Sequence, residues 1–504
     1  MSSWSFSRKG TVFVLVAIIL IGAFLRLHDL GKENLWTDEA FSLHHAQEED
    51  LTSLFEQVAK TEAAPLGYYV LLHYWVKAFG NSEFSVRLPS AIFGVLSILM
   101  IFLLTRLFFD RKVALLSSFF LATSMLQVLY SQEARLYSMF TFLTLLSAYF
   151  FFKWYLCRNI WGKKIYQAGY FLSILAAVYT NYLAVILIAL YSFVLLFNWK
   201  GSNTLFKKWV LMHIIVLVLS LPLLSWLLTQ YTLLNTGLSN TLISKGVPGI
   251  LASTGIFLFT IPFILILSGL LGLYLLRNQL KDIFVKVKIT DFLFTILFLV
   301  FCASYVYLTK NGLYVFGINV IPNPITHSYF LIRHPFFLVS FVYIFIAYKI
   351  VYMKAKKLAV LCILLIIIVN SSSLSSYYQT TTKAEWEEVV LHIKSESANP
   401  SILVDKGGSS NIFLLEYYSQ EPTEIVRLTW SNRTEGRNLK RIDLDVLDGI
   451  LKQRGDFWLV LARGSDDYYK EYLDERYSLT EEKEFYEISL YHYGHKDQKT
   501  NNFI

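Results

Sequence analysis

The sequence predicts a polytopic α-helical membrane protein with a small α/β domain at its C-terminus. Of its 504 residues, 55% are hydrophobic and only 16% are charged, whereas soluble domains are typically ~45–50% apolar and ~25% charged. Apolar runs of about 18 or more residues, the length that a transmembrane helix needs, recur along the chain. This pattern stops near residue 375. We therefore predict a membrane domain over 1–375 and an α/β domain over 376–504.

The apolar runs predict eleven transmembrane helices. The first run follows Arg8 and Lys9 and ends without a small-residue cleavage site, so we expect an uncleaved span rather than a signal peptide. The three cysteines lie in or at the end of such runs and have neither metal-ligand nor disulfide spacing. The predicted spans are 11–28, 88–109, 113–129, 139–157, 165–180, 182–198, 209–229, 250–276, 289–308, 332–350 and 357–374.

The distribution of charge predicts the orientation. Basic residues cluster between the spans at 106–112, 163–164 and 354–357, as expected of cytoplasmic loops. Because the basic residues lie in these loops, the net charge of +8 does not indicate a nucleic-acid-binding protein. We expect a protein of the inner or plasma membrane. With the N-terminus inside and eleven spans, the C-terminal domain is expected to be extracytoplasmic.

One apolar segment, 65–79, is too short for a comfortable span and contains His73 and Lys77. Its length and its Tyr and Trp content favour a helix lying in the membrane interface. The first outer loop is then long, about 29–87.

The C-terminal region alternates helices with strands. An amphipathic helix opens after Lys383, and strands are predicted at 401–405, 424–429, 456–462 and near 484–492. The helices between them are predicted at 410–419, 443–453 and 466–477. Such alternation indicates a partly parallel sheet.

Three polar clusters share the predicted outer face. The first is the pair Asp38 and Glu39, which could instead be solvated loop carboxylates or helix caps. The second is the turn 130–138, where Glu133 and Arg135 could simply pair with each other or extend to the interface. The third is the loop 309–334, whose Pro-Asn-Pro indicates ordered non-helical backbone and whose polar residues are Lys310, Tyr314, Asn319, His327, Arg333 and His334.

Such a set of residues suits glycosyl transfer from a sugar phosphate. A carboxylate can deprotonate an acceptor hydroxyl, and guanidinium groups clamp phosphate oxygens and stabilise the charge that develops on them. A phosphate leaving group is a weak base, so no general acid is needed. Nucleotide sugars are cytoplasmic, so an outward-facing site needs a donor carried on a lipid, which the spans would bind.

These residues resemble the membrane glycosyltransferases of the GT-C type, in particular the bacterial branch of the protein O-mannosyltransferase and lipid A aminoarabinose transferase superfamily. The resemblance covers about 10–180 by motif and the remainder by layout. It rests on Trp36-Thr-Asp-Glu-Ala40, Ala64-Pro-Leu-Gly-Tyr-Tyr69, Phe84-Ser-Val-Arg-Leu-Pro-Ser90, Tyr130-Ser-Gln-Glu-Ala-Arg-Leu-Tyr137 and, more weakly, Tyr329-Phe-Leu-Ile-Arg-His-Pro335.

The resemblance implies an inverting transferase that moves a sugar from a polyprenyl-phosphate donor to an acceptor hydroxyl. It implies that Asp38 acts as base or orients the acceptor, with Glu39 beside it in the catalytic motif. Donor phosphate would be bound by Arg135 and Arg333, with Glu133 supporting Arg135. The expected lining of the substrate pocket is Glu62, Pro65, Tyr68, Tyr69, Arg87 and Tyr137.

The sequence departs from the family pattern before Pro65. Relatives commonly carry a cation there, whereas this chain reads Glu62-Ala-Ala-Pro65, so Lys60 is a candidate substitute. No cofactor is assigned, and a divalent cation remains possible although no Asp-x-Asp pair or His cluster indicates one.

Other functions stay open from the sequence. A transporter or flippase for a lipid-linked glycan would also carry polar residues along a membrane pathway, but no broken spans recur at matching positions of two halves. A polysaccharide polymerase or ligase, or a scaffold for the outer domain, are further alternatives. The expected partners are the polyprenyl-phosphate-linked sugar, a glycan, lipid or protein acceptor, and membrane lipids.

The topology predicts the outcome of cysteine labelling. Single cysteines introduced near residue 35 and near residue 430, in a chain whose natural cysteines are replaced by serine, should both react with a membrane-impermeant reagent added outside the cell. Reaction on opposite faces would contradict the predicted number of spans and separate the C-terminal domain from the proposed site.

Overall fold

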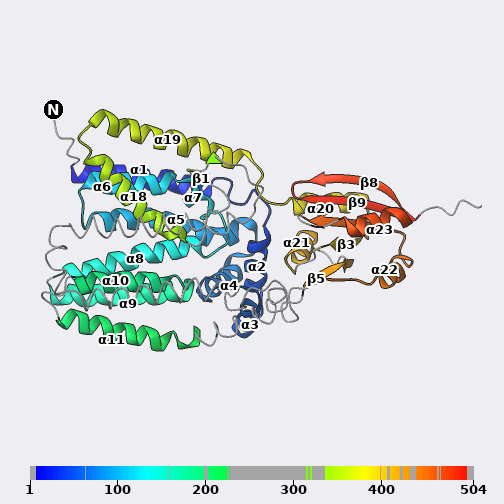
Figure 1. Ribbon diagram of the computed structural model, residues 1–504, viewed down its shortest axis with the longest axis horizontal. Helices are drawn as coiled ribbons and strands as arrows, with labels where there is room; N and C mark the ends of the chain where they lie inside the picture. The colour runs from blue at the N-terminus through cyan, green and yellow to red at the C-terminus, as the bar shows by residue number, and fades with distance from the viewer. Residues whose placement is uncertain are drawn as a thin grey trace, which may run out of the picture.

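The computed structural model describes residues 7–62, 64–157, 159–197, 203–223, 226, 314–315, 318–319, 335–397, 399–405, 409–420, 424–431, 439–462, 465 and 467–495. A bundle of long helices fills one end of the molecule, and the C-terminal strands with their helices lie at the other (Figure 1). Between the two ends lie the short helices that follow α1, so the first loop joins the bundle to the C-terminal elements.

The bundle helices run side by side (Figure 1). Among the described residues, four helices are long and apolar enough to cross a membrane: α1, α5, α8 and α19. The bundle consists of α1 (Arg8–Leu27), α5 (Glu83–Thr105), α6 (Arg111–Thr123), α8 (Tyr137–Leu156), α9 (Ile160–Thr180), α10 (Ala184–Phe197), α11 (Asn203–Leu219), α18 (Val339–Val351) and α19 (Lys356–Gln379). The predicted spans 250–276 and 289–308 lie outside the described residues.

The predicted span 113–129 is not one helix. It is divided at Ser124 into α6 and α7 (Met125–Leu129), because Ser124 has extended backbone angles (φ −67°, ψ 120°) and its hydroxyl caps α7. The last turn of α6 is held by Arg26 of α1, which donates to Ala122 O (3.0 Å) and Leu121 O (3.2 Å). These carbonyls have no partner within their own helix, so the fully buried guanidinium satisfies them.

Three short helices, α2 (Thr37–Ala46), α3 (Leu51–Thr61) and α4 (Gly67–Phe79), form the first loop. They lie at the end of the bundle that faces the C-terminal strands (Figure 1). The helix α4 confirms the separate helix predicted over 65–79, and its 13 residues span about 20 Å, less than the ~30 Å of a bilayer core. Gly67 lets α4 approach α9 closely, because a Cβ there would lie 2.7 Å from Tyr179 O.

The C-terminal elements build a five-stranded sheet in the order β4-β3-β7-β9-β8. Strand β3 is parallel to β4 and β7, and β9 is antiparallel to β7 and β8. The elements are α20 (Trp386–Glu396), β3 (Ser401–Asp405), α21 (Ser409–Ser419), β4 (Glu424–Arg427), α22 (Leu444–Leu451), β7 (Asp456–Ala462), α23 (Tyr468–Arg476), β8 (Tyr477–Phe485) and β9 (Ile488–His495). Two short pairs, β5 (Thr429–Ser431) with β6 (Leu439–Arg441) and β1 (Tyr314–Val315) with β2 (Ile318–Asn319), lie outside this sheet.

The predicted strands 401–405 and 456–462 are confirmed residue for residue as β3 and β7, and the predicted partly parallel sheet is confirmed with them. Strand β8 was not predicted. It is an edge strand whose residues are mostly exposed and include Glu481, Glu482 and Lys483, so it lacks the apolar alternation that marks a half-buried strand.

A single hydrophobic cluster connects the first loop to the C-terminal sheet. It joins Leu43 of α2, Tyr130 and Leu136 of the turn before α8, and Trp386 and Val389 of α20. Burial of apolar area is the main favourable term in such contacts. The first loop is therefore packed between the bundle and the C-terminal elements.

Candidate active site

A fully buried ion pair, Arg87 of α5 with Glu39 of α2, lies at the centre of the first loop. Arg87 Nε donates to Glu39 Oε1 (2.9 Å) and Arg87 Nη2 to Glu39 Oε2 (2.8 Å), a bidentate arrangement. The remaining guanidinium protons go to the backbone carbonyls of Leu30 (3.0 Å), Glu33 (2.8 Å) and Asn34 (2.9 Å). All five donors of Arg87 are thus used inside the protein.

Glu39 has two further strong partners. Its Oε1 accepts from Ala134 N (2.8 Å), and its Oε2 accepts from Lys383 Nζ (3.0 Å). Burial alone would raise the pKa of Glu39, but Arg87 and Lys383 lower it to about 2. The carboxylate therefore stays ionised and links α2, α5, the turn before α8 and the segment after α19.

This geometry changes the roles predicted for Glu39 and Arg87. Glu39 is 0% exposed and Arg87 is 1% exposed, and both side chains are occupied by each other and by the backbone. Neither group can reach a substrate without breaking this network, which would leave a charge buried without its partner. The structure favours a positioning role for both residues over the catalytic and pocket roles predicted from the sequence.

A second buried ion pair lies beside the first and contains Arg135. Its Nη1 and Nη2 donate to Glu62 Oε1 (2.7 Å) and Oε2 (3.0 Å), and Nη1 also donates to Ser42 Oγ (3.0 Å) and Asp38 O (3.0 Å). Burial alone would lower the pKa of Arg135, but Glu62, Tyr69 and Asp38 raise it well above its ordinary value. Arg135 is therefore cationic whenever the site is folded.

Arg135 has a carboxylate partner that was not predicted for it. Glu62, which follows α3, pairs with its guanidinium group. Glu133 was expected to support Arg135, and its backbone carbonyl accepts from Arg135 N (2.8 Å). Glu62, three residues before Pro65, thus brings a negative charge to Arg135.

Lys60, the candidate substitute for the missing cation, is exposed on α3, where its Nζ lies 3.6 Å from Glu56 Oε2. The buried lysine in this region is Lys383, which belongs to the C-terminal part of the chain.

Asp38 lies in the first turn of α2, half-buried, while Glu39 next to it points into the core. The Asp38 carbonyl accepts from Arg135 Nη1 and from Ser42 Oγ (both 3.0 Å). Its side-chain charge is close enough to act on Arg135. The structure thus brings together Asp38 and Arg135, which are 97 residues apart in the sequence.

Around Arg135 lie two buried polar atoms that have no hydrogen-bond partner in the described part of the chain, Arg135 Nε and His45 Nδ1. The ring of His45 contacts that of Tyr69 edge-on at 5.8 Å, and its Nε2 lies 2.8 Å from Thr61 Oγ1. Burial lowers the pKa of His45 to about 4, against the opposing effect of Glu62, so the ring is neutral at pH 7. Unpaired buried polar atoms are rare in folded proteins, and these two, beside one another, mark a candidate site for a polar ligand.

Tyr68, Tyr137 and Pro65 are buried residues of the segments that form this site. The Tyr68 hydroxyl lies 3.2 Å from Ser90 Oγ, which donates to Arg135 O (3.0 Å). The ring of Tyr137 contacts that of Tyr130 edge-on at 5.1 Å. Pro65 is buried just before α4. The predicted phosphate ligand Arg333 lies outside the described residues.

Sequence reasoning missed the roles of Lys383, Glu62 and His45. Lys383 is 344 residues from Glu39, and no local pattern links such distant positions. Among the described residues, no group of three or more His, Cys, Asp or Glu side chains is placed to hold a metal ion.

Comparisons with known proteins agree with this architecture. Residues 63–226 match the family described as dolichyl-phosphate-mannose-protein mannosyltransferase. YkcB of Bacillus subtilis (strain 168), named as a mannosyltransferase by assignment only, is 27% identical to this chain over 231 aligned residues. The alignment covers 44% of this chain and 31% of YkcB. The chain therefore spans about a third of the length of this curated relative.

Among solved structures, ArnT from Cupriavidus metallidurans in the apo state has a TM-score of 0.52 at 12% identity, covering 96% of this chain and 98% of ArnT. ArnT bound to undecaprenyl phosphate gives 0.51 at 14% identity with the same coverage. The Archaeoglobus fulgidus oligosaccharyltransferase in complex with Zn and sulfate gives 0.52 at 13% identity, covering 96% of this chain and 73% of that one. The resemblance to GT-C glycosyltransferases is thereby confirmed, and the chain has their helical membrane fold.

The Glu39 network predicts a large and pH-dependent loss of stability in Glu39→Gln. Arg87 and Lys383 would be left buried without a counter-charge, which costs about 3–5 kcal/mol. Because the pKa of Glu39 falls from 4.5 to about 2 on folding, its stabilisation is present above about pH 4.5 and is lost as the pH falls toward 2. Thermal unfolding of the protein in detergent should show the variant well below the wild type at pH 7, with the gap narrowing toward pH 3.

The matched control is Glu56→Gln, which removes the same charge from an exposed ion pair on α3. It should leave the unfolding temperature unchanged, as surface pairs usually do. Equal effects of the two substitutions, or a gap that widens on acidification, would contradict the role given to Glu39.

Proposed function

We propose that this chain is an inverting glycosyltransferase that moves a sugar from a polyprenyl-phosphate donor to an acceptor hydroxyl on the outer face of the membrane. In this proposal residues 1–375 bind the donor lipid and carry the chemistry, and residues 376–504 form an extracytoplasmic domain. The observation that carries it is the meeting of Asp38 and Arg135, with Arg135 Nη1 3.0 Å from Asp38 O, beside buried polar atoms that have no protein partner among the described residues.

Asp38 is the proposed base. An acceptor hydroxyl that lies within about 2.6–3.2 Å of its carboxylate can transfer its proton as the oxygen forms a bond to the anomeric carbon. On the opposite side of that carbon, the bond to the phosphate oxygen breaks and the electron pair leaves with the phosphate. One displacement of this kind inverts the configuration at the anomeric carbon.

Arg135 is the proposed phosphate ligand. Phosphate leaves with one more negative charge than it carries in the donor, and a fixed buried cation stabilises that charge more strongly than water does. Arg135 Nε has no partner among the described residues, so the guanidinium group has one donor left for a phosphate oxygen. The bidentate contact with Glu62 holds the guanidinium plane in place while this edge stays available.

Glu39 and Arg87 act in this proposal as positioning residues. Glu39 accepts from Ala134 N, the residue before Arg135, and lies next to Asp38 in α2. The same carboxylate therefore sets the position of both the base and the cation.

The comparisons support the class of donor. The matched family is described by its lipid-phosphate sugar donor, and the neighbour ArnT has been solved with undecaprenyl phosphate. Both concern polyisoprenoid phosphates, and the described helices α1, α5, α8 and α19 are apolar enough to accompany such a lipid.

Asp38→Asn should abolish sugar transfer by purified protein supplied with a polyprenyl-phosphate sugar. Loss of a general base typically costs ~10²–10⁴-fold in rate, and the unfolding temperature should stay near that of the wild type because Asp38 is only half-buried. Glu49→Gln, at an exposed carboxylate of the same loop, is the matched control and should retain activity. Full transfer by Asp38→Asn would remove Asp38 from the mechanism.

Arg135 should matter for the donor and not for the acceptor. Arg135→Lys, which keeps the charge but loses the planar fork, is expected to lose about tenfold in kcat/KM for the donor. Arg135→Ala is expected to lose ~10²–10³-fold, with little change in the KM for the acceptor. Combining Arg135→Ala with Glu62→Gln avoids an unpaired buried carboxylate; small and equal losses in all three variants would indicate a structural ion pair instead.

A further inference from the structure

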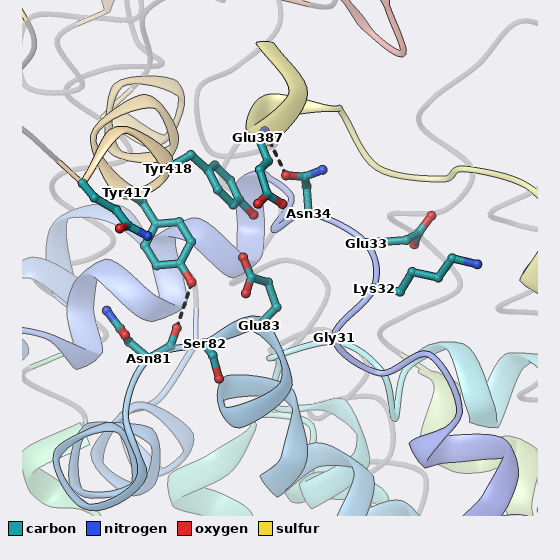
Figure 2. A pocket seen from close by; sticks show the side chains of 11 residues that line it. Gly31, Lys32, Glu33, Asn34, Asn81, Ser82, Glu83, Glu387, Tyr417 and Tyr418 are labelled. Atoms are coloured by element: carbon teal, nitrogen blue, oxygen red, sulfur yellow. Dashed lines mark hydrogen bonds between the residues drawn. The ribbon is translucent and has the colours of Figure 1, made fainter. Parts of the chain in front are cut away.

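A pocket of about 540 Å³ lies between the first loop and the C-terminal elements (Figure 2). Asn34 and the start of α5, with Asn81 and Glu83, form one wall. Glu387 of α20 and the tyrosines Tyr417 and Tyr418 of α21 form the other. The volume lies within the ~300–1,000 Å³ that small-molecule sites occupy.

Hydrogen bonds between the two walls fix the shape of this pocket. They run from Glu387 N to Asn34 Oδ1 (3.0 Å), from Leu35 N to Tyr418 Oη (2.8 Å) and from Tyr417 Oη to Asn81 O (3.0 Å). On the bundle side, Arg87 binds the carbonyls of Glu33 and Asn34. A pocket whose walls are already fixed loses little conformational entropy when it binds a ligand.

The polar groups of the pocket match a ligand rich in hydroxyl groups. Figure 2 shows the Glu83 carboxylate pointing toward the hydroxyl of Tyr417 and the ring of Tyr418. Each of these hydroxyls makes one hydrogen bond between the walls and also interacts with the Glu83 carboxylate, which can accept several hydrogen bonds. Aromatic rings with polar tips beside carboxylates and amides offer both donors and acceptors to a saccharide ring.

The charge of the pocket disfavours an anionic ligand, because carboxylates outnumber basic groups among its lining residues. The carboxylates of Glu83 and Glu387 share the space, and burial together with Glu83 raises the pKa of Glu387. Lys32 also lines the pocket, but its ammonium group pairs with Asp29 (3.2 Å). The guanidinium group of Arg87 pairs with Glu39 (2.8 Å). A phosphate group would meet uncompensated negative charge, whereas a neutral or amino-bearing sugar would not.

The pocket is also close to the proposed base. Asn34 precedes Asp38 by four residues, and four residues span at most ~14 Å even when fully extended. A chain of a few sugar units that sits in the pocket can therefore bring its terminal hydroxyl to Asp38.

We propose that this pocket binds the saccharide part of the acceptor, a neutral or amino-bearing glycan without phosphate, and directs its hydroxyl toward Asp38. The proposal rests on the proposed function and adds the acceptor class to it. The C-terminal elements then contribute directly to acceptor recognition through Glu387, Tyr417 and Tyr418.

The test is saccharide binding by the full-length protein in detergent, without any donor. The probes for saturation-transfer NMR are a glucosamine trisaccharide, its N-acetylated counterpart and mannose 6-phosphate. Both trisaccharides should bind and mannose 6-phosphate should not. Glu83→Gln and Tyr417→Phe should each weaken binding of the glucosamine trisaccharide about tenfold, as loss of a hydrogen bond involving a charged group does.

The matched control is Glu396→Gln, at an exposed carboxylate of the same helix as Glu387 but outside the pocket, and it should bind like the wild type. Thermal unfolding of each variant separates lost binding from lost folding. No saccharide binding, binding unchanged in both Glu83→Gln and Tyr417→Phe, or equal binding of mannose 6-phosphate would overturn the proposal.

This test is independent of turnover. Trisaccharide binding that depends on Glu83, in a protein that transfers no sugar, would support the pocket and reject the proposed function. Sugar transfer whose acceptor KM is the same in the wild type and in Glu83→Gln would reject the pocket and leave the proposed function standing.

Discussion

The buried carboxylate of Glu39 is the interaction on which the rest of the site depends. It receives Arg87 in a bidentate pair, Lys383 at 3.0 Å and Ala134 N at 2.8 Å, so four segments that are distant in sequence meet at one group. Removing an ion from water is expensive, and the cost is recovered only where its partners are well placed. The hydrogen-bond network of Glu39 is therefore either fully formed or lost. It thus holds the four segments in one relative position.

That constraint explains how the half-buried Asp38 and the buried Arg135 can stay close together. Asp38 follows the orientation of α2, and Arg135 follows the turn whose Ala134 N binds Glu39. Glu62 then fixes the guanidinium plane from a third segment. Because Arg87 also binds the loop carbonyls that border the pocket of Figure 2, the same network shapes the space proposed for the acceptor. Donor phosphate and acceptor sugar would thus meet different faces of one rigid loop.

Much of this architecture is local and was therefore predictable. Apolar runs marked most of the described bundle helices, and β3 and β7 were predicted residue for residue because buried strands are continuous apolar runs. Which of the two side chains, Asp38 or Glu39, is buried was not predictable. Successive helical residues point about 100° apart, so one faces the core and the other does not, and only the packed fold shows which. The pairing of Glu62 with Arg135 and of Lys383 with Glu39 depends on contacts across 73 and 344 residues, for which a single sequence carries no signal.

The most direct measurement of the central claim is an experimental structure of the full-length protein with undecaprenyl phosphate bound. A phosphate oxygen within hydrogen-bond distance of Arg135 Nε, with Asp38 facing the vacant space beside it and Glu39 still bound to Arg87, is the predicted result. A phosphate bound elsewhere, while Arg135 remains paired only with Glu62, would contradict the proposed site.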